Sequence, residues 1–176
     1  MPHSFHLGNL PVQLGIGRLV SLRWTAAIHE EWIGNLVADG RTARERLVRA
    51  RDIMRHVPPD ADLQGYEPRV TRLTLPAPGD RHVLAAAIEG GATVLLTFNL
   101  KDFPSDLLVP FGISAGDPAG LLSEFFTGDP GAVEAVVDEA HLNLRRAAPA
   151  REAFVQALAR QRLPGFVTCL QGRDQR

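Results

Sequence analysis

This sequence of 176 residues has one cysteine, no long apolar run and a net charge close to zero. Its one cysteine excludes a disulfide framework and makes the reducing cytoplasm the expected compartment. No apolar run approaches the roughly 18–20 residues that a membrane-spanning helix needs, and the first residues lack the basic and apolar regions of a signal peptide. The formal net charge of -1 exerts no overall attraction on RNA or on membranes, so binding of a polyanion would need a local basic patch.

Two familiar kinds of site are also missing from the pattern. The 6 histidines form no pair that has zinc-ligand spacing and a nearby third ligand. Gly15 and Gly17 are not preceded by a strand and lack the third glycine of a dinucleotide-binding loop. Zinc and nucleotide chemistry are therefore not expected, which leaves the acidic residues as the candidates for chemistry.

Helical periodicity dominates both ends of the sequence. Thr25 is the expected N-cap of a helix that ends at Gly40, and a strongly charged helix follows over 42–56. After a stretch rich in glycine and proline at 112–120, helices are expected at 118–127, 130–146 and 150–161. We therefore predict two parts, an α/β domain over 1–112 and a helical C-terminal extension over 113–176.

The middle of the chain combines a short helix with a strand. Asp80 precedes an apolar helix over 83–88, which two glycines end. Residues 93–98 are apolar and β-branched, which is typical of a buried parallel strand. Shorter strands are expected at 70–75 and 107–113. Alternation of helix and buried strand predicts an α/β fold with a parallel sheet.

The acidic residues of this region are expected at one edge of the sheet. A helix of about 10 residues spans on the order of 15 Å, and the strand that returns from it, about six residues long, spans on the order of 20 Å. The start of the helix, at Asp80, and the segment 99–102 after the strand should therefore meet beyond the carboxyl end of the strand. Active sites of open α/β sheets lie at this edge, and carboxylates there suit a hard divalent cation such as Mg²⁺.

Each of these acidic residues also has an ordinary structural explanation. Asp80 suits the N-cap of a helix, and Asp102, which precedes Phe103 and Pro104, suits a turn. Glu30 and Glu31 lie in the first turns of a helix, where acidic side chains favour the helix dipole or face solvent.

Three stretches also resemble a known family, the PIN domains. They are Asp80 to Ala87, Leu95 to Pro104, and Trp24 to Leu36. The last is similar to the helix that carries the family's glutamate, for which Glu31 is the better match and Glu30 the alternate. The tail over 110–164 resembles the helical extension of one subgroup of VapC toxins. The resemblance implies a PIN-like three-layer α/β/α fold with a central parallel sheet, followed by a C-terminal helical extension.

The family implies a Mg²⁺- or Mn²⁺-dependent endoribonuclease, the toxin of a type II toxin–antitoxin system that a cognate antitoxin silences. Carried over residue by residue, Glu31, Asp80 and Asp102 would be metal ligands, directly or through water. Thr97 would supply a hydroxyl near the scissile phosphate. Asn99 stands where many members carry an aspartate; it accepts a hydrogen bond or binds metal weakly but brings no charge, and Asp102 is the alternative for that role.

One departure from the family concerns its first strand, which ends in a metal-binding aspartate. No acidic residue occurs before Glu30 in this sequence. Loss of that strand would expose apolar faces and unpaired edges in the middle of the sheet. We expect either that the natural chain begins upstream and carries the strand, or that this is a truncated, inactive module that binds an antitoxin or RNA.

Two further features stay open from sequence alone. A run of arginines covers the charged helix: Arg41, Arg44, Arg46, Arg49, Arg51 and Arg55. It is either a solvated helix face, a contact for RNA phosphates, or a docking surface for the antitoxin or a second copy of the chain. His82 either faces the cleft or lies on the helix surface.

Overall fold

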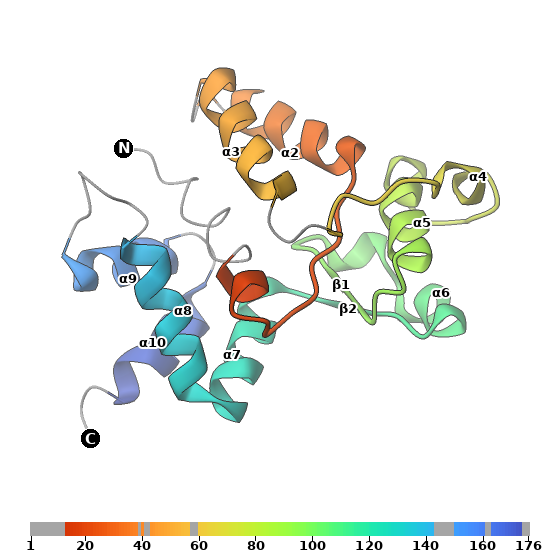
Figure 1. Ribbon diagram of the computed structural model, residues 1–176. Coiled ribbons are helices and arrows are strands. Elements are labelled where there is room, and N and C mark those ends of the chain that lie inside the picture. The colour runs from red at the N-terminus through yellow and green to blue at the C-terminus, as the bar shows by residue number, and fades with distance from the viewer. Residues whose placement is uncertain are drawn as a thin grey trace.

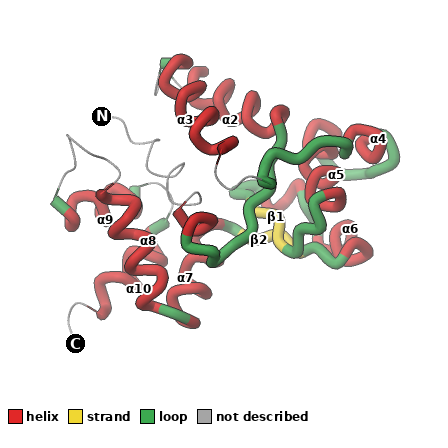
Figure 2. Tube along the Cα trace, viewed as in Figure 1, coloured by secondary structure: helices red, strands yellow, loops and turns green. Residues whose placement is uncertain are grey.

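The computed structural model of this protein describes residues 13–38, 40, 43–56, 60–142, 150–160 and 163–173. It is a mixed α/β structure that is mostly helical, with a small parallel sheet at its centre (Figures 1 and 2). The α-helices are α2 (Ala26–Ala38), α3 (Arg44–His56), α4 (Glu67–Val70), α5 (Arg81–Glu89), α6 (Ser105–Leu108), α7 (Pro118–Gly128), α8 (Pro130–Leu142), α9 (Arg151–Ala159) and α10 (Pro164–Arg173). The 3₁₀ turns are η1 (Pro78–Asp80), η2 (Leu100–Asp102) and η3 (Val109–Phe111), and the strands are β1 (Val94–Leu96) and β2 (Ser114–Gly116).

Local signals set the helix boundaries as the sequence predicts. The Thr25 hydroxyl accepts a hydrogen bond from the Ile28 amide at 3.1 Å and caps α2. Gly40 and Gly91 follow the ends of α2 and α5 with φ of +64° and +61°, in the left-handed region where glycine carries no steric penalty. The helices predicted at 118–127, 130–146 and 150–161 are confirmed as α7, α8 and α9 over the residues that the structure describes, and 143–146 and 161 lie outside those residues.

The predicted strand over 93–98 is confirmed as β1, which pairs in parallel with β2 through Leu95 opposite Ala115. Its predicted burial on both faces is wrong. Leu95 packs against Leu84 and Ala87 of α5, whereas Val94 and Leu96 are 37% and 41% exposed. Within the described residues β1 has β2 as its one neighbouring strand, and the Val94 and Leu96 side chains remain partly exposed.

Two other strand predictions are also wrong. Residues 70–75 follow the short helix α4 as a turn and extended chain, and residues 107–113 form the end of α6 and η3. Both α4 and η3 have a proline in their first turn, where its fixed φ favours a helical start. The strand of this region begins later, at Ser114.

The C-terminal helices form an apolar cluster of their own. Its fully buried members include Phe154, Leu158 and Phe166, and α10, which the sequence did not predict, packs against α7 and α9. A helical turn over 13–16 adds Leu14 to this cluster, so the N-terminal described segment lies against the C-terminal helices (Figure 1).

A second cluster joins β1 to α5, α6 and the turn between them. It contains Leu84, Leu95, Phe103 and Leu108. The predicted division of the chain into two domains at residue 112 stays a prediction. The strand β2 lies after residue 112 and pairs with β1, which lies before it. The three-layer arrangement also stays a prediction, since two strands and one isolated parallel bridge, Trp24 with Asp62, are present in the described part of the chain. No helix among these residues is long and apolar enough to cross a membrane.

Candidate functional site

Asp80 occupies the position before the first residue of α5. Its backbone is helical, with φ −85° and ψ −2°, and its side chain makes no capping hydrogen bond. An N-cap residue normally has extended dihedrals and uses its side-chain oxygen to accept from the helix. Capping therefore does not explain the aspartate at this position, and its half-buried carboxylate is available for other contacts.

The two neighbouring glutamates of α2 have different surroundings. Glu30 binds two arginines of α3, with Oε2 at 2.5 Å from Arg44 Nη2 and Oε1 at 3.1 Å from Arg51 Nη1. Glu31 points to the start of α5, where its Oε2 lies 3.4 Å from His82 Nε2. Glu30 thus joins two helices on the outside, and Glu31 is the glutamate that reaches the neighbourhood of Asp80. This geometry favours Glu31 over its alternate.

A polar turn follows β1 and contains the other three predicted residues. Thr97 extends the sheet by one hydrogen bond, from its amide to the Gly116 carbonyl at 3.0 Å, and its hydroxyl accepts from the Asn99 amide at 3.0 Å. The side-chain amide of Asn99 donates to the Asp102 carboxylate. The structure therefore brings Thr97, Asn99 and Asp102 together in one turn, with Asp102 on η2.

The predicted ligands do not form one complete group. Carboxylate oxygens are the donors that Mg²⁺ prefers, and such donors are present at the start of α5 and after β1. However, no set of three or more His, Cys, Asp or Glu side chains in the described part of the chain is close enough together to hold a metal ion. Within the described residues the predicted carboxylates therefore do not meet in one cluster of three.

His82 is a site neighbour that the resemblance does not assign. Its Nδ1 lies 2.7 Å from the Gly79 carbonyl oxygen, one residue before Asp80. Its Nε2 is buried, lies 3.4 Å from Glu31 Oε2 and makes no hydrogen bond. The sequence signal for it is its place in the first turn of α5, two residues after Asp80.

The start of α2 contains a buried histidine. His29 is 1% exposed, and its Nδ1 accepts a hydrogen bond from Trp32 Nε1 at 3.0 Å. Burial lowers the pKa of His29 from its ordinary value of 6.5, and the carboxylate of Asp62 opposes this shift. The imidazole therefore packs in its neutral form, as part of the support of the helix that carries Glu31.

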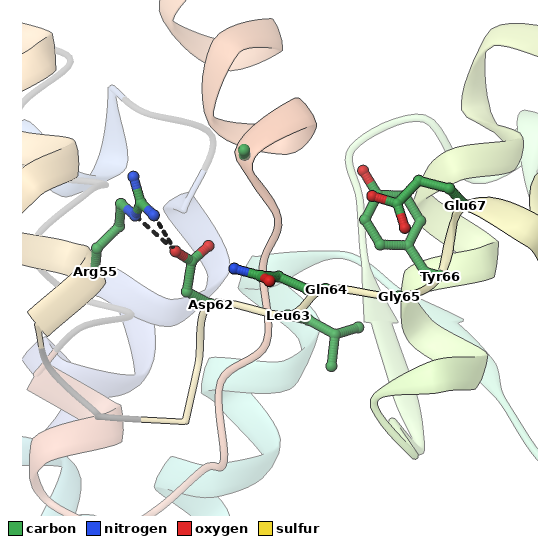
Figure 3. Close-up of a pocket in the computed structure, with 8 residues that line it drawn as sticks. Arg55, Asp62, Leu63, Gln64, Gly65, Tyr66 and Glu67 are labelled. Carbon is green, nitrogen blue, oxygen red and sulfur yellow. Dashed lines mark hydrogen bonds and ion pairs between the residues drawn. The ribbon is translucent and has the colours of Figure 1, made fainter.

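A pocket of about 350 Å³ lies elsewhere, between the end of α3 and the start of α4 (Figure 3). Arg55 and Asp62 form an ion pair on one side of it, with Nη2 and Oδ2 2.5 Å apart, and Tyr66 and Glu67 line the other side. None of the five predicted site residues lines this pocket. The pocket is therefore separate from the candidate site.

The arginines of α3 mostly make contacts within the molecule. Arg44 and Arg51 bind Glu30, and Arg55 binds Asp62. Arg46 and Arg49 are exposed, and Arg41 lies outside the described residues. Three of the arginines that were candidates for contacts to RNA phosphates, Arg44, Arg51 and Arg55, therefore form ion pairs with carboxylates of the same chain.

Comparison with known proteins gives one partial match. Over 43 residues the chain is 54% identical to a protein of Mycobacterium tuberculosis named "Putative ribonuclease VapC50". The matched stretch is 24% of this chain and 25% of that protein, so the chain spans about a quarter of the length of this relative. No protein-family model matches the chain, and no solved structure matches it. The likeness supports a relation to VapC proteins of the PIN family over this stretch.

Proposed function

We propose that this protein is an endoribonuclease of the VapC type, the toxin of a type II toxin–antitoxin pair, acting in the cytoplasm. The observation that carries the proposal is the stretch of 43 residues that is 54% identical to a protein named as a ribonuclease. The geometry adds that Asp80 does not cap its helix and that Glu31 points to the start of the same helix.

The proposed site consists of Glu31, Asp80, Asp102, Thr97 and Asn99. The carboxylates are the proposed ligands of Mg²⁺ or Mn²⁺, because hard divalent cations select oxygen donors. The Thr97 hydroxyl and the Asn99 amide lie in the same turn as Asp102, where polar groups suit contacts to a phosphodiester. RNA is the proposed substrate, and a cognate antitoxin and a second copy of the chain are the proposed protein partners.

Incubation with RNA in the presence of Mg²⁺ or Mn²⁺ tests this proposal. We expect cleavage that EDTA removes and that Asp80→Asn reduces by at least about 100-fold, since loss of a metal-binding or charge-stabilising group costs rates of this order. Asp106→Asn is the matched control, because Asp106 is an exposed aspartate in the first turn of α6 and outside the proposed site. Cleavage that survives Asp80→Asn as well as it survives Asp106→Asn would remove Asp80 from the site.

A second candidate is a noncatalytic PIN-like module that binds an antitoxin or RNA. The lack of three clustered candidate ligands in the described residues favours it. Calorimetric titration of the wild-type chain with Mn²⁺ separates the two candidates. Binding that Asp80→Asn weakens supports the enzyme, and the absence of heat together with the absence of RNA cleavage supports the binding module.

A further inference from the structure

Arg81, the first residue of α5, has a guanidinium that no group in the described part of the chain binds. Its Nε is buried and makes no hydrogen bond, and the side chain forms no ion pair with a described residue. Nη1 and Nη2 are not buried in this way, so the end of the guanidinium remains accessible. A buried polar atom without a partner costs free energy, and most buried polar atoms in folded proteins have one.

The burial of Arg81 sets it apart from the other cationic side chains. Where arginine and lysine side chains are described, each one that lacks a carboxylate partner is exposed, whereas Arg81 is partly buried. It shares a helix face with Leu84 and Ala85, which are 1% and 0% exposed. An arginine stem often covers such an apolar face while its charged head stays in water. In Arg81 part of the head is buried as well.

The end of the helix also disfavours a positive charge at this position. The amides at a helix N-terminus carry a partial positive charge, so a cation there is less stable than an anion. Asp80 precedes Arg81 directly, yet the two side chains form no ion pair. Contacts within the described chain therefore leave this charge unmatched. An anion from outside that binds Nη1 and Nη2 would match it.

We propose that Arg81 binds a phosphate of the RNA backbone beside the acidic residues of the candidate site. A guanidinium presents planar N–H donors that match a phosphate, and burial of Nε limits the directions in which its accessible end can point. The proposed site has carboxylates but no cationic side chain, so a phosphate there needs a nearby positive charge to offset the repulsion. Arg81 supplies this charge one residue after Asp80. The inference rests on the proposed function for its ligand, RNA.

Two substitutions separate the charge of Arg81 from its shape. Arg81→Met keeps an unbranched stem on the apolar face and removes the guanidinium. Arg81→Lys keeps the charge and removes the planar set of donors. Arg160→Met is the matched control, because Arg160 is an exposed arginine at the end of α9 that forms no ion pair with a described residue. The probe is a labelled single-stranded RNA in EDTA, and its dissociation constant is measured over a range of salt concentrations.

Arg81→Met should weaken RNA binding at low salt by about 10- to 100-fold, because hydrogen bonds from a charged group are lost. The slope of log affinity against log salt concentration should become shallower by about 0.7, the value for one phosphate contact to a single strand. Arg81→Lys should keep the wild-type slope and lose less affinity than Arg81→Met. Arg160→Met should change neither quantity. Equal effects of Arg81→Met and Arg160→Met overturn the proposal, as do equal slopes for Arg81→Lys and Arg81→Met.

Thermal unfolding separates a ligand-binding role from a structural one. Arg81→Met should unfold within about 2 °C of the wild type or above it, because the stem contacts remain and an unmatched charge at the helix end is removed. A Tm lowered by more than about 5 °C with an unchanged salt slope would assign Arg81 to the stability of the fold and overturn the phosphate contact.

Failure of the proposed nuclease activity is distinguishable from failure of this contact. A wild-type chain that binds RNA through Arg81 but cleaves none with Mg²⁺ or Mn²⁺ refutes the activity and supports the contact. A wild-type chain that cleaves RNA while Arg81→Met binds it as well as Arg160→Met does refutes the contact alone. Absence of RNA binding by the wild type refutes both.

Discussion

The N-cap at Thr25 offers the sharpest test of how α2, the helix that carries Glu31, is held in place. Thr25 is fully buried, its hydroxyl accepts from the Ile28 amide at 3.1 Å, and its carbonyl accepts from the His29 amide at 3.0 Å. Thr25→Val keeps the shape of the side chain and removes the hydroxyl. Thr25→Ser keeps the hydroxyl and removes one methyl group. The two variants thus separate capping from packing at one position.

The magnitudes follow from these contacts. Loss of a helix cap costs about 0.5–2 kcal/mol, and a donor left unsatisfied in a partly buried position costs about 1–3 kcal/mol, so we expect Thr25→Val to lower the free energy of unfolding by about 1–2 kcal/mol. Loss of one buried methyl group costs about 1 kcal/mol, which is the expected effect of Thr25→Ser. For a chain of this size each kcal/mol lowers Tm by about 2–4 °C.

Urea unfolding gives the free energies, and hydrogen exchange gives the location of the change. The amide of Ile28 should exchange faster in Thr25→Val, because it loses its acceptor, and should remain protected in Thr25→Ser. A Thr25→Val protein as stable as the wild type, or an Ile28 amide equally protected in both variants, would show that the hydroxyl does not cap α2 in solution.

Two further changes probe the histidine beneath α2 and the C-terminal core. Burial lowers the pKa of His29 below its ordinary value of 6.5, so the unfolded chain takes up a proton first as the pH falls. Well above pH 6.5, His29 should not change the free energy of unfolding. Below pH 6.5 that free energy should fall as the pH drops, and the effect of His29 should level off below its lowered pKa. Urea unfolding of His29→Asn across this pH range should lack this part of the pH dependence. Phe166 of α10 is fully buried, so Phe166→Ala should lower the free energy of unfolding in urea by about 3–5 kcal/mol. The control is Gln171→Ala, at an exposed position on the same helix. If the two variants differ by less than about 1 kcal/mol, α10 is not part of the core.

Structural features that depend on a few adjacent residues could be predicted from the sequence. Thr25 and Gly40 mark the two ends of α2, and Gly91 follows α5, because caps and left-handed glycines act within one helical turn. The apolar, β-branched composition around β1 predicted that this segment is a strand, and its predicted parallel pairing is confirmed by β2. The likeness of the segments around Asp80 to PIN domains also belongs to the sequence.

The sequence-based predictions were wrong in two situations. In one, the same residue types are compatible with a strand or a helical turn; in the other, the burial of a residue depends on segments far away in the sequence. The apolar stretches near Val70 and Leu108 had the composition of strands, yet each contains a short helical turn with a proline, Pro68 or Pro110, near its start. Val94 and Leu96 were expected in the interior, but burial of a strand requires a neighbour on both faces, and local composition carries no information about that neighbour.

The sequence by itself predicted α2, α3, α5, α7, α8 and α9, the strand β1, and the acidic residues proposed for the site. Only the tertiary structure separated the two adjacent glutamates, because Glu30 and Glu31 have the same local chemistry and differ in the helix that each one faces. The tertiary structure also places His82 between Glu31 and the turn before Asp80. It places Arg44 and Arg51 in ion pairs with Glu30 of α2, so these two arginines do not form a free basic surface. Side-chain partners of this kind come from segments far apart in the chain, and it is packing between helices that selects them.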